Sequence, residues 1–406
     1  MNEIFELQYA LDTFYFLMCG ALVMWMAAGF AMLEAGLVRS KNTTEILTKN
    51  IALFAVACTM YMICGYGIMY GGGSFDYFLS GITGDGATGV EEPATYAPSA
   101  DFYFQVVFVA TAMSIVSGSV AERMKLWSFL AFAVVMTGFI YPVQGVWSWG
   151  GGFLSETVGY SDYAGSGIVH LCGATAALSG VLFLGPRKGK YNSDGKVNAI
   201  PGANMPLAAI GMFILWMGWF GFNGGSELAV SSVESSNNVA SVFVNTNAAA
   251  AGGLLAALGL AQLLYGKADL TMAVNGALAG LVAITADPLS ATGGMATLIG
   301  AVGGIIVVLS VKFFDSIQID DPVGAISVHG VVGLWGLVAV TINSDVTVLA
   351  PLTGASVIFV WTFATSSIVW YLLKLSMGVR VSDEQEYEGV DVSECGIVAY
   401  PEFDSK

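Results

Sequence analysis

The chain has 406 residues, of which 56% are hydrophobic and 11% are charged. One water-soluble core cannot bury that much apolar surface. The composition therefore excludes an ordinary soluble domain and indicates a protein that crosses a membrane many times, in contact with lipid. The formal net charge of −16 argues against a nucleic-acid partner, because the phosphate backbone is itself anionic.

Eleven apolar stretches are long enough to cross a bilayer as helices, which takes about 20 residues. We expect them at about residues 11–36, 44–70, 101–120, 126–148, 164–185, 204–224, 237–265, 271–287, 293–314, 323–343 and 352–376. The eighth stretch is the shortest. Most of the stretches lack the polar face that core helices of soluble proteins keep. The predicted fold class is an all-α membrane protein with eleven transmembrane helices.

The basic residues indicate how these spans are oriented. All fourteen fall on one side of the predicted arrangement, in or beside its odd-numbered gaps and at the end of the chain: Arg39, Lys41, Lys49, Arg123, Lys125, Arg187, Lys188, Lys190, Lys196, Lys267, Lys312, Lys374, Arg380 and Lys406. Basic residues gather on cytoplasmic loops. We therefore place the chain in the cell (inner) membrane as a multi-pass protein, with its N-terminus outside and its C-terminus in the cytoplasm.

The chain contains two histidines, His170 and His329, in closely matching contexts. Each stands eight residues after an aspartate, Asp162 or Asp321, in the pattern D-x-x-G-x-x-x-V-H. The histidines belong to the fifth and tenth spans. A repeat of five spans makes the second copy enter the membrane from the opposite side, and equivalent residues of such inverted repeats meet near the midplane. We therefore expect the two histidines to lie together in the middle of the bilayer.

A weaker match supports the same internal repeat. The segment GFAMLEAG at residues 29–36 of the first span resembles GWFGFNGG at 218–225 of the sixth. The predicted architecture is two inverted five-helix repeats, at about 11–185 and 204–343, with an eleventh helix at about 352–376 that braces the periphery.

A single histidine in an apolar span is usually a packed residue with one hydrogen-bond partner. Two histidines at symmetric depths favour a path for an ion, a proton or a substrate. Two imidazoles without a third ligand make a poor zinc or copper site, and no nucleophile motif stands beside either histidine. We predict no metal, no cofactor and no enzymatic activity. Paired neutral imidazoles can share one proton and turn their outer nitrogens to a narrow lumen.

Several motifs resemble those of the ammonium transporter (Amt/MEP/Rh) family, on its Amt branch. They are DYAGSGIVHLCGATAALSGVLFLGPR at 162–187, GWFGFNGGS, DDPVGAISVHG, ERMK and the closing GVRVSDEQEYEGVDVSECGIVAY. The resemblance covers essentially the whole chain. It implies a homotrimer of eleven-helix protomers, each with its own pore for ammonium or ammonia, and methylammonium as a further candidate substrate.

The same resemblance implies roles for individual residues. Phe104, Trp149 and Ser226 correspond to an outer site that recruits the substrate, and Phe108 and Phe222 correspond to a gate of two stacked rings. The physics agrees, because a Trp face attracts a cation and a hydroxyl oxygen accepts an N–H bond. Without the motifs, Phe104 and Trp149 would be assigned to an interfacial aromatic belt.

The two repeated aspartates are expected to differ in role. The resemblance places Asp162 near the recruitment site, where it shapes the outer vestibule and favours a cation electrostatically without touching it. Asp321 faces the cytoplasm just before Pro322, and its simplest task is to cap the tenth helix.

Residues 1–376 are expected to form the transmembrane domain and residues 377–406 a cytoplasmic tail. The tail carries eight acids from Val381 onward. It resembles the family's regulatory segment, which docks on a neighbouring protomer and meets PII-type signalling proteins. Sequence physics alone favours a disordered, solubilising tail.

These observations predict an ammonium transporter. It recruits NH4+ outside, deprotonates it and conducts ammonia through a hydrophobic twin-histidine pore, because a low-dielectric pore disfavours the charged amine. Whether the proton crosses separately is left open. The alternative is an ammonium sensor that signals through its tail, and a membrane enzyme using His170 and His329 is disfavoured by the missing third ligand.

Overall fold

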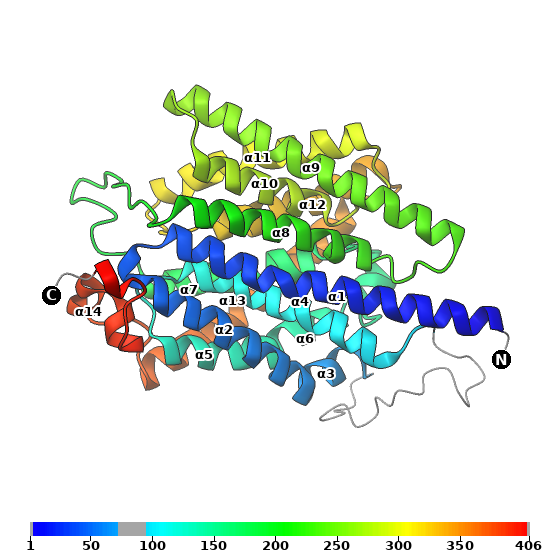
Figure 1. Ribbon diagram of the computed structural model, residues 1–406, viewed down its shortest axis with the longest axis horizontal. Helices are drawn as coiled ribbons and strands as arrows, with labels where there is room; N and C mark the ends of the chain where they lie inside the picture. Colours follow the sequence, from blue (N-terminus) through cyan, green and yellow to red (C-terminus); the bar gives the residue numbers. More distant parts are fainter. Residues whose placement is uncertain (1–2, 72–94, 404–406) are drawn as a thin grey trace.

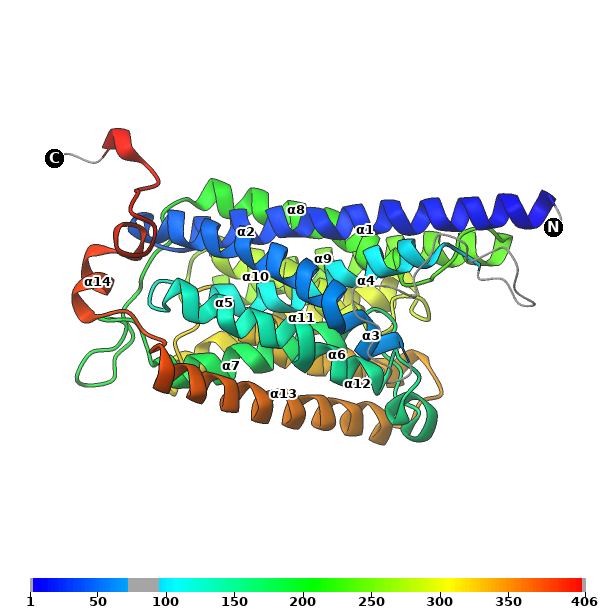
Figure 2. The same cartoon turned by 90° about the horizontal axis from the view of Figure 1, so that it is seen from below.

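The computed structural model describes residues 3–71 and 95–403, and these residues fold almost entirely into helices. The long helices run along the longest axis of the molecule (Figure 1). The N-terminus of α1 (Glu3–Leu37) lies at one end of the bundle and α14 (Asp383–Glu388) at the other, in both views (Figure 2). Within the described ranges, extended pairing is limited to two isolated bridges.

The first half of the bundle contains five spans. They are α1; α2 (Thr43–Met60), which continues through a π-helical segment into α3 (Tyr66–Tyr70); α4 (Pro98–Ser119); α5 (Leu126–Val135), which continues into α6 (Tyr141–Val146); and α7 (Cys172–Leu184), which is preceded by the π-helical segment Ser166–Leu171.

The second half contains six spans. They are α8 (Met205–Gly225), α9 (Val233–Tyr265), α10 (Leu270–Ile284), α11 (Gly293–Ser316), α12 (Val332–Asn343) after the π-helical segment Ile326–Val331, and α13 (Leu349–Ser376). The last of these, α13, runs along the edge of the bundle (Figure 2). The eleven predicted spans are therefore confirmed, and the eleventh is peripheral.

Ten of the described spans are long and apolar enough to cross a membrane, and α10 is a shorter apolar helix of 15 residues. At 1.5 Å per residue, such a helix is shorter than a hydrocarbon core of about 30 Å. It is shielded from lipid, because every residue from Ala273 to Ile284 is buried. Its first turns, at Thr271, Met272 and Asn275, line a cavity, so this end of the helix does not need to reach the membrane surface.

Spans one and six pack in opposite directions, as an inverted repeat requires. Gly36 of α1 lies against Ala208 of α8, and Gly29 lies against Leu215 further along. A Cβ atom at Gly36 would come within 2.5 Å of the Ala208 nitrogen. Small residues therefore allow close helix contact where lipid and protein are equally apolar.

Spans five and ten show the same antiparallel relation. Gly330 lies against Ala174, whereas Gly336, further along the tenth span, lies against Ser166, earlier in the fifth. Each of the two spans also begins with a π-helical segment that contains its histidine. The fifth and tenth spans therefore run in opposite directions but have the same local helix type and the same histidine position.

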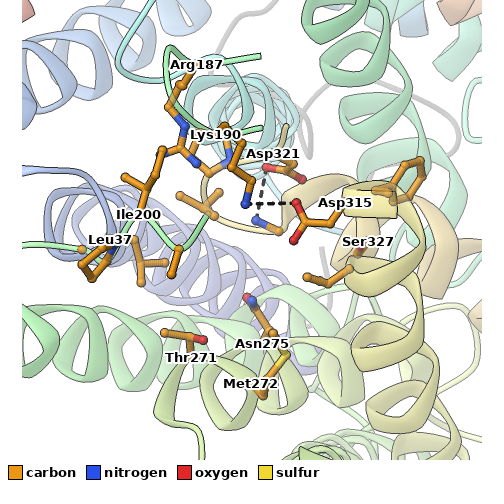
Figure 3. Close-up of a pocket in the computed structure, with 18 of the residues that line it drawn as sticks. Leu37, Arg187, Lys190, Ile200, Thr271, Met272, Asn275, Asp315, Asp321 and Ser327 are labelled. Atoms are coloured by element: carbon orange, nitrogen blue, oxygen red, sulfur yellow. Dashed lines mark hydrogen bonds and ion pairs between the residues drawn. The ribbon is translucent and has the colours of Figure 1, made fainter. Parts of the chain in front are cut away.

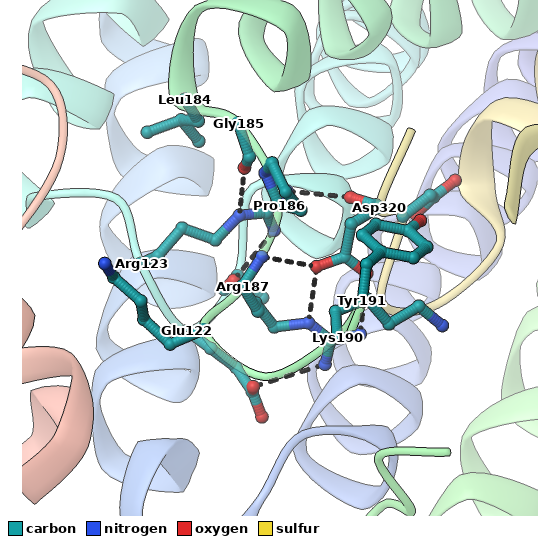
Figure 4. A network of polar contacts seen from close by, with 12 residues as sticks. Glu122, Arg123, Leu184, Gly185, Pro186, Arg187, Lys190, Tyr191 and Asp320 are labelled. Atoms are coloured by element: carbon teal, nitrogen blue, oxygen red, sulfur yellow. Dashed lines mark hydrogen bonds and ion pairs between the residues drawn. The ribbon is translucent and has the colours of Figure 1, made fainter. Parts of the chain in front are cut away.

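A cluster of largely buried ion pairs joins four connecting loops at the end of the bundle that holds α14. Figure 4 shows its central residues Glu122, Arg187 and Asp320. The guanidinium group of Arg187 bonds both oxygens of Asp320 at 2.8 and 2.9 Å and contacts Glu122 at 3.2 Å. Arg39 also pairs with Glu122, at 2.7 Å. Burial alone would raise the pKa of the Glu122 and Asp320 carboxyls, but the neighbouring guanidinium groups lower both pKa values below their ordinary range.

The described part of the acidic tail packs against this end of its own chain. The Asp391 carboxylate accepts a bond of 2.8 Å from the backbone N–H of Glu45, in the first turn of α2. Glu394 accepts one of 2.9 Å from the N–H of Leu126, where α5 begins. Carboxylates at helix N-termini satisfy unpaired N–H groups and the helix dipole. Two of the tail's acids, Asp391 and Glu394, are therefore helix caps. The interpretation of a disordered tail is wrong for the described part of this segment.

Candidate functional site

Three of the four residues predicted to bind substrate line one cavity at the end of the bundle that holds the N-terminus. Phe104, Trp149 and Ser226 come from α4, from the turn after α6 and from the end of α8, and they enclose a volume of about 280 Å³. The Ser226 hydroxyl donates to the carbonyl of Phe222 at 2.8 Å. Its oxygen lone pairs therefore remain available to accept a hydrogen bond in the cavity.

The cavity also contains a carboxylate that the sequence analysis did not single out. Asp101 lines it, and its carboxylate accepts hydrogen bonds from the Tyr66 hydroxyl at 2.5 Å and from the Gln105 amide at 3.4 Å. The signal was present in the sequence. Asp101, Phe104, Gln105 and Phe108 occur at helical spacing i, i+3, i+4 and i+7, which places them on one face of α4. An anionic group beside an aromatic face suits a small cation.

Asp162 does not line this cavity. Its buried carboxylate accepts backbone N–H bonds from Gly165, Gly167 and Ile168 at 3.1, 2.8 and 2.9 Å, and a bond of 3.0 Å from the Tyr160 hydroxyl. Burial raises the pKa of Asp162, although these four donors oppose the rise.

We call the cavity lined by Phe104, Trp149 and Ser226 the outer cavity, after the predicted outer site. Asp162 acts on it through its backbone. Its carbonyl oxygen accepts a hydrogen bond of 2.9 Å from the indole Nε1 of Trp149 and so fixes the orientation of that ring. The side chain holds the start of the fifth span, and the main chain holds the Trp.

Asp321 has the same local task in the second repeat. Its carboxylate accepts from the N–H groups of Gly324 and Ile326 at 3.2 and 2.7 Å. Gly165 and Gly324 both have positive φ, at +111° and +81°, a backbone region that glycine enters at little cost. The expected cap at Asp321 is present, and Asp162 forms a more extensive one.

The rings of Phe108 and Phe222 pack together at the base of the outer cavity. Phe108 forms part of the cavity wall, and its ring centroid lies 4.1 Å from that of Phe222 at an interplanar angle of 32°. Both side chains are almost completely buried. The aromatic series continues outward, because the Trp149 ring lies 5.9 Å from Phe108 with its plane nearly perpendicular.

The two histidines lie directly beyond this pair. The ring of His170 is stacked 5.4 Å from Phe222, and its Nδ1 lies 3.2 Å from Nδ1 of His329. At such a contact one nitrogen donates and the other accepts, so in the neutral pair one outer Nε2 is a donor and the other an acceptor. The buried Nε2 of His170 has no hydrogen-bond partner in the structure. A buried polar atom without a partner is rare, so this nitrogen is a candidate contact for a small solute.

Local backbone geometry positions both rings. The π-helical segments Ser166–Leu171 and Ile326–Val331 contain the histidines, and such wide turns often occur at functional sites. The ring of Trp219 stacks 5.0 Å from His170 and is itself held by a bond of 2.8 Å from its Nε1 to the hydroxyl of Thr285, at the end of α10.

A second cavity, of about 340 Å³, lies at the opposite end of the bundle. Figure 3 shows the residues that line it. Asn275, Asp321 and Ser327 line it, together with Lys190, which pairs with Asp315 at 3.0 Å. We call it the inner vestibule. The predicted residues thus form a series from the outer cavity through the phenylalanine pair to the histidines, and the inner vestibule lies on the far side.

A family model described as the Ammonium Transporter Family matches residues 14–400. The chain belongs to the ammonium transporter family. Ammonium transporter Amt2 of Archaeoglobus fulgidus is 41% identical, over 97% of this chain and 88% of that protein. The putative ammonium transporter sll1017 of Synechocystis is 40% identical, over 97% and 90%.

Solved structures agree with the family assignment. A structure described as Sensor Amt Protein is 33% identical with a TM-score of 0.90, over 96% of this chain and 99% of that one. Mep2 of Candida albicans is 25% identical with a TM-score of 0.84, over 99% and 93%. The resemblance predicted from the motifs is confirmed. As a member of the ammonium transporter family, the chain is a multi-pass membrane protein and a transporter, not an enzyme.

Proposed function

We propose that this ammonium transporter recruits NH4+ in the outer cavity, releases its proton there and passes ammonia between the phenylalanine rings to the histidines. The observation that carries the proposal is the unbroken series Trp149, Phe108, Phe222, His170, His329, in which each ring centroid lies 4.1–5.9 Å from the next. Within this series, the buried Nε2 of His170 has no hydrogen-bond partner.

The outer cavity favours the charged form of the substrate. The indole face of Trp149 and the carboxylate of Asp101 attract a cation, and the Ser226 oxygen accepts one N–H bond. Asp162 acts indirectly, by holding the Trp149 ring and the start of the fifth span. This is a positioning role and not contact with the substrate.

The segment beyond Phe108 favours the neutral form. The Phe108, Phe222 and His170 side chains are almost fully buried, and the rings supply no formal charge. Moving a cation from water into such surroundings is strongly unfavourable, so the amine loses its proton before it passes. Ammonia both donates and accepts hydrogen bonds, which matches the donor and acceptor that the neutral histidine pair presents.

We place the protein in the cell (inner) membrane with its N-terminus outside, and the distribution of basic residues supports this orientation. The basic residues Arg39, Arg123, Arg187 and Arg380 gather at the end of the bundle that carries α14, and the positive-inside rule makes that end cytoplasmic. The tail at residues 377–406 is then a cytoplasmic regulatory segment on the transmembrane domain 1–376. A homotrimer and a PII-type signalling protein as partner belong to the same proposal.

A second candidate is an ammonium sensor that signals through its tail. The structural likeness to the protein described as Sensor Amt Protein favours it. The tail contacts the starts of α2 and α5, so a shift of either helix changes the surface that a partner meets.

Currents in proteoliposomes test the proposal. Ammonium applied to vesicles that contain the protein should evoke a saturable current or pH change above that of empty vesicles, whereas sodium and potassium should evoke none. Ammonium binding without transport, accompanied by a changed distance between the tail and α5, would favour the sensor.

A further inference from the structure

One buried carboxylate in the membrane region has no part in the function proposed so far. Glu34 lies near the inner end of α1 and is 1% exposed. Its carboxylate accepts hydrogen bonds from the Asn50 amide of α2 at 2.8 Å and from the Ser117 hydroxyl of α4 at 2.7 Å. Ionisable side chains within membrane spans are costly and often mark the path of an ion or proton.

Both donors to Glu34 are neutral. The nearby cation Lys49 forms its ion pair with Glu45 at 2.7 Å, and both of those side chains are fully buried. Across the cavity described next, Asn275 of α10 and His329 face Glu34. In the described ranges no basic side chain forms an ion pair with Glu34, so the carboxyl can exist with or without its proton while keeping its hydrogen-bond partners.

Glu34 and His329 line the same small cavity, on the side of the histidine pair away from Phe222. Its volume of about 10 Å³ is close to the space that one water molecule needs. Asn275 and Val323 line this cavity and also the inner vestibule. The Asn275 side chain lies among the residues that surround the vestibule (Figure 3). In space, the histidine pair, Glu34 and the inner vestibule therefore follow one another along one route.

We propose that Glu34 is the proton acceptor on the inner side of the histidine pair. The carboxylate takes up the proton that has passed His329, directly or through one water, and becomes a neutral acid. It then gives the same proton to ammonia or water at the vestibule and returns to the carboxylate. The inference rests on the proposed transport function and adds a site for the proton between His329 and the inner vestibule.

Glu34→Gln is the central test, in the full chain reconstituted in proteoliposomes. Gln keeps the shape, one oxygen for the Asn50 amide and an N–H for the Ser117 oxygen, but it cannot carry a proton in relay. The ammonium-evoked current should fall by roughly a hundredfold, the lower end of what a positioned proton-transfer group contributes. The melting temperature should stay near that of the wild type.

Ser117→Ala is the matched control. It removes one hydrogen bond to Glu34 but leaves the carboxyl, so it should lower the melting temperature and keep most of the current. Equal losses of current in Ser117→Ala and Glu34→Gln, with both proteins less stable, would show that the carboxylate only joins α1 to α4.

Glu34→Asp decides the matter if the Gln variant does not assemble. If Glu34 relays the proton, the shorter side chain of Asp should lower the ammonium-evoked current, and D2O should reduce that current more than it does in the wild type. If Glu34 is purely structural, the effect of D2O on the current should be the same in the variant and the wild type. Wild-type vesicles without any ammonium response would overturn the transport function itself. Normal wild-type current with unchanged current in Glu34→Gln would overturn only the role of Glu34.

Discussion

The Nδ1 atoms of His170 and His329 lie 3.2 Å apart between two rings that are almost completely buried. The histidines are 159 positions apart in the chain and come from spans that run in opposite directions. Their contact is therefore a product of the inverted repeat. It leaves one donor and one acceptor nitrogen pointing away from the shared bond when both rings are neutral.

Replacing either histidine with Ala should alter conduction without preventing assembly. Removing one ring leaves the buried Nδ1 of the other without a partner, at a cost of about 1–3 kcal/mol, but the surrounding helices pack through other contacts. We expect an assembled, somewhat less stable protein with a changed ammonium current or changed selectivity against potassium. Solid-supported membrane currents measure both. Variants with unchanged current and unchanged selectivity would remove the histidines from the mechanism.

Trp149→Leu should weaken recruitment more than maximal rate. Leu keeps apolar volume but lacks the ring quadrupole, which contributes about 0.5–2 kcal/mol to holding a cation, equivalent to about a 2- to 30-fold change in affinity. The half-saturating ammonium concentration should rise by that factor. Trp147→Leu is a control, because Trp147 is not among the residues of the outer cavity. A constant half-saturating concentration in a folded Trp149→Leu protein contradicts the cation–π assignment.

Asp162→Asn should impair transport more than Asp321→Asn. The Asn NH2 group donates and cannot accept, so at least one backbone N–H loses its acceptor in either variant. At 162 this loss lies in the segment whose carbonyl oxygen holds the Trp149 ring, so it also disturbs the outer cavity. Each unpaired buried donor costs about 1–3 kcal/mol. Currents and melting temperatures at matched reconstitution compare the two variants. Equal losses would mean that both aspartates are only symmetric caps.

The buried pair of Arg187 and Asp320 should make the protein sensitive to acid. Because the folded-state pKa of Asp320 is lowered, its stabilising contribution is present above the unfolded value of about 3.9 and is lost as pH falls below it. Asp320→Asn should lower stability near neutral pH by about 3–5 kcal/mol and flatten the acid slope. Thermal melts across pH measure both effects.

The exposed pair of Lys188 and Asp383 serves as the control for that experiment. It has a similar separation of 2.8 Å, but its side chains are 56% and 76% exposed. Water and salt screen such a pair, so Asp383→Asn should change the melting temperature little. A large effect there, or none at Asp320, would contradict the importance assigned to the buried cluster.

The sequence by itself determined the membrane class, the number of spans and the contact of the histidines. These depend on local properties: apolar length decides whether a helix spans a bilayer, and an odd-span repeat decides that the copies are inverted. The outer residues Phe104, Trp149 and Ser226 came from motif resemblance, and the structure places them around one cavity. The spacing of Asp101 with Phe104 and Phe108 contained a usable signal that was overlooked.

Only the tertiary structure decided which groups the remaining charges face. Asp162 looked like an electrostatic partner of the cation, but its oxygens are occupied by N–H groups of the following turn. The tail's acids looked like solvated charges, yet Asp391 and Glu394 cap helices that begin hundreds of residues earlier. The free energy of a charge depends on burial and on partners from distant parts of the chain, and neither is encoded in local periodicity.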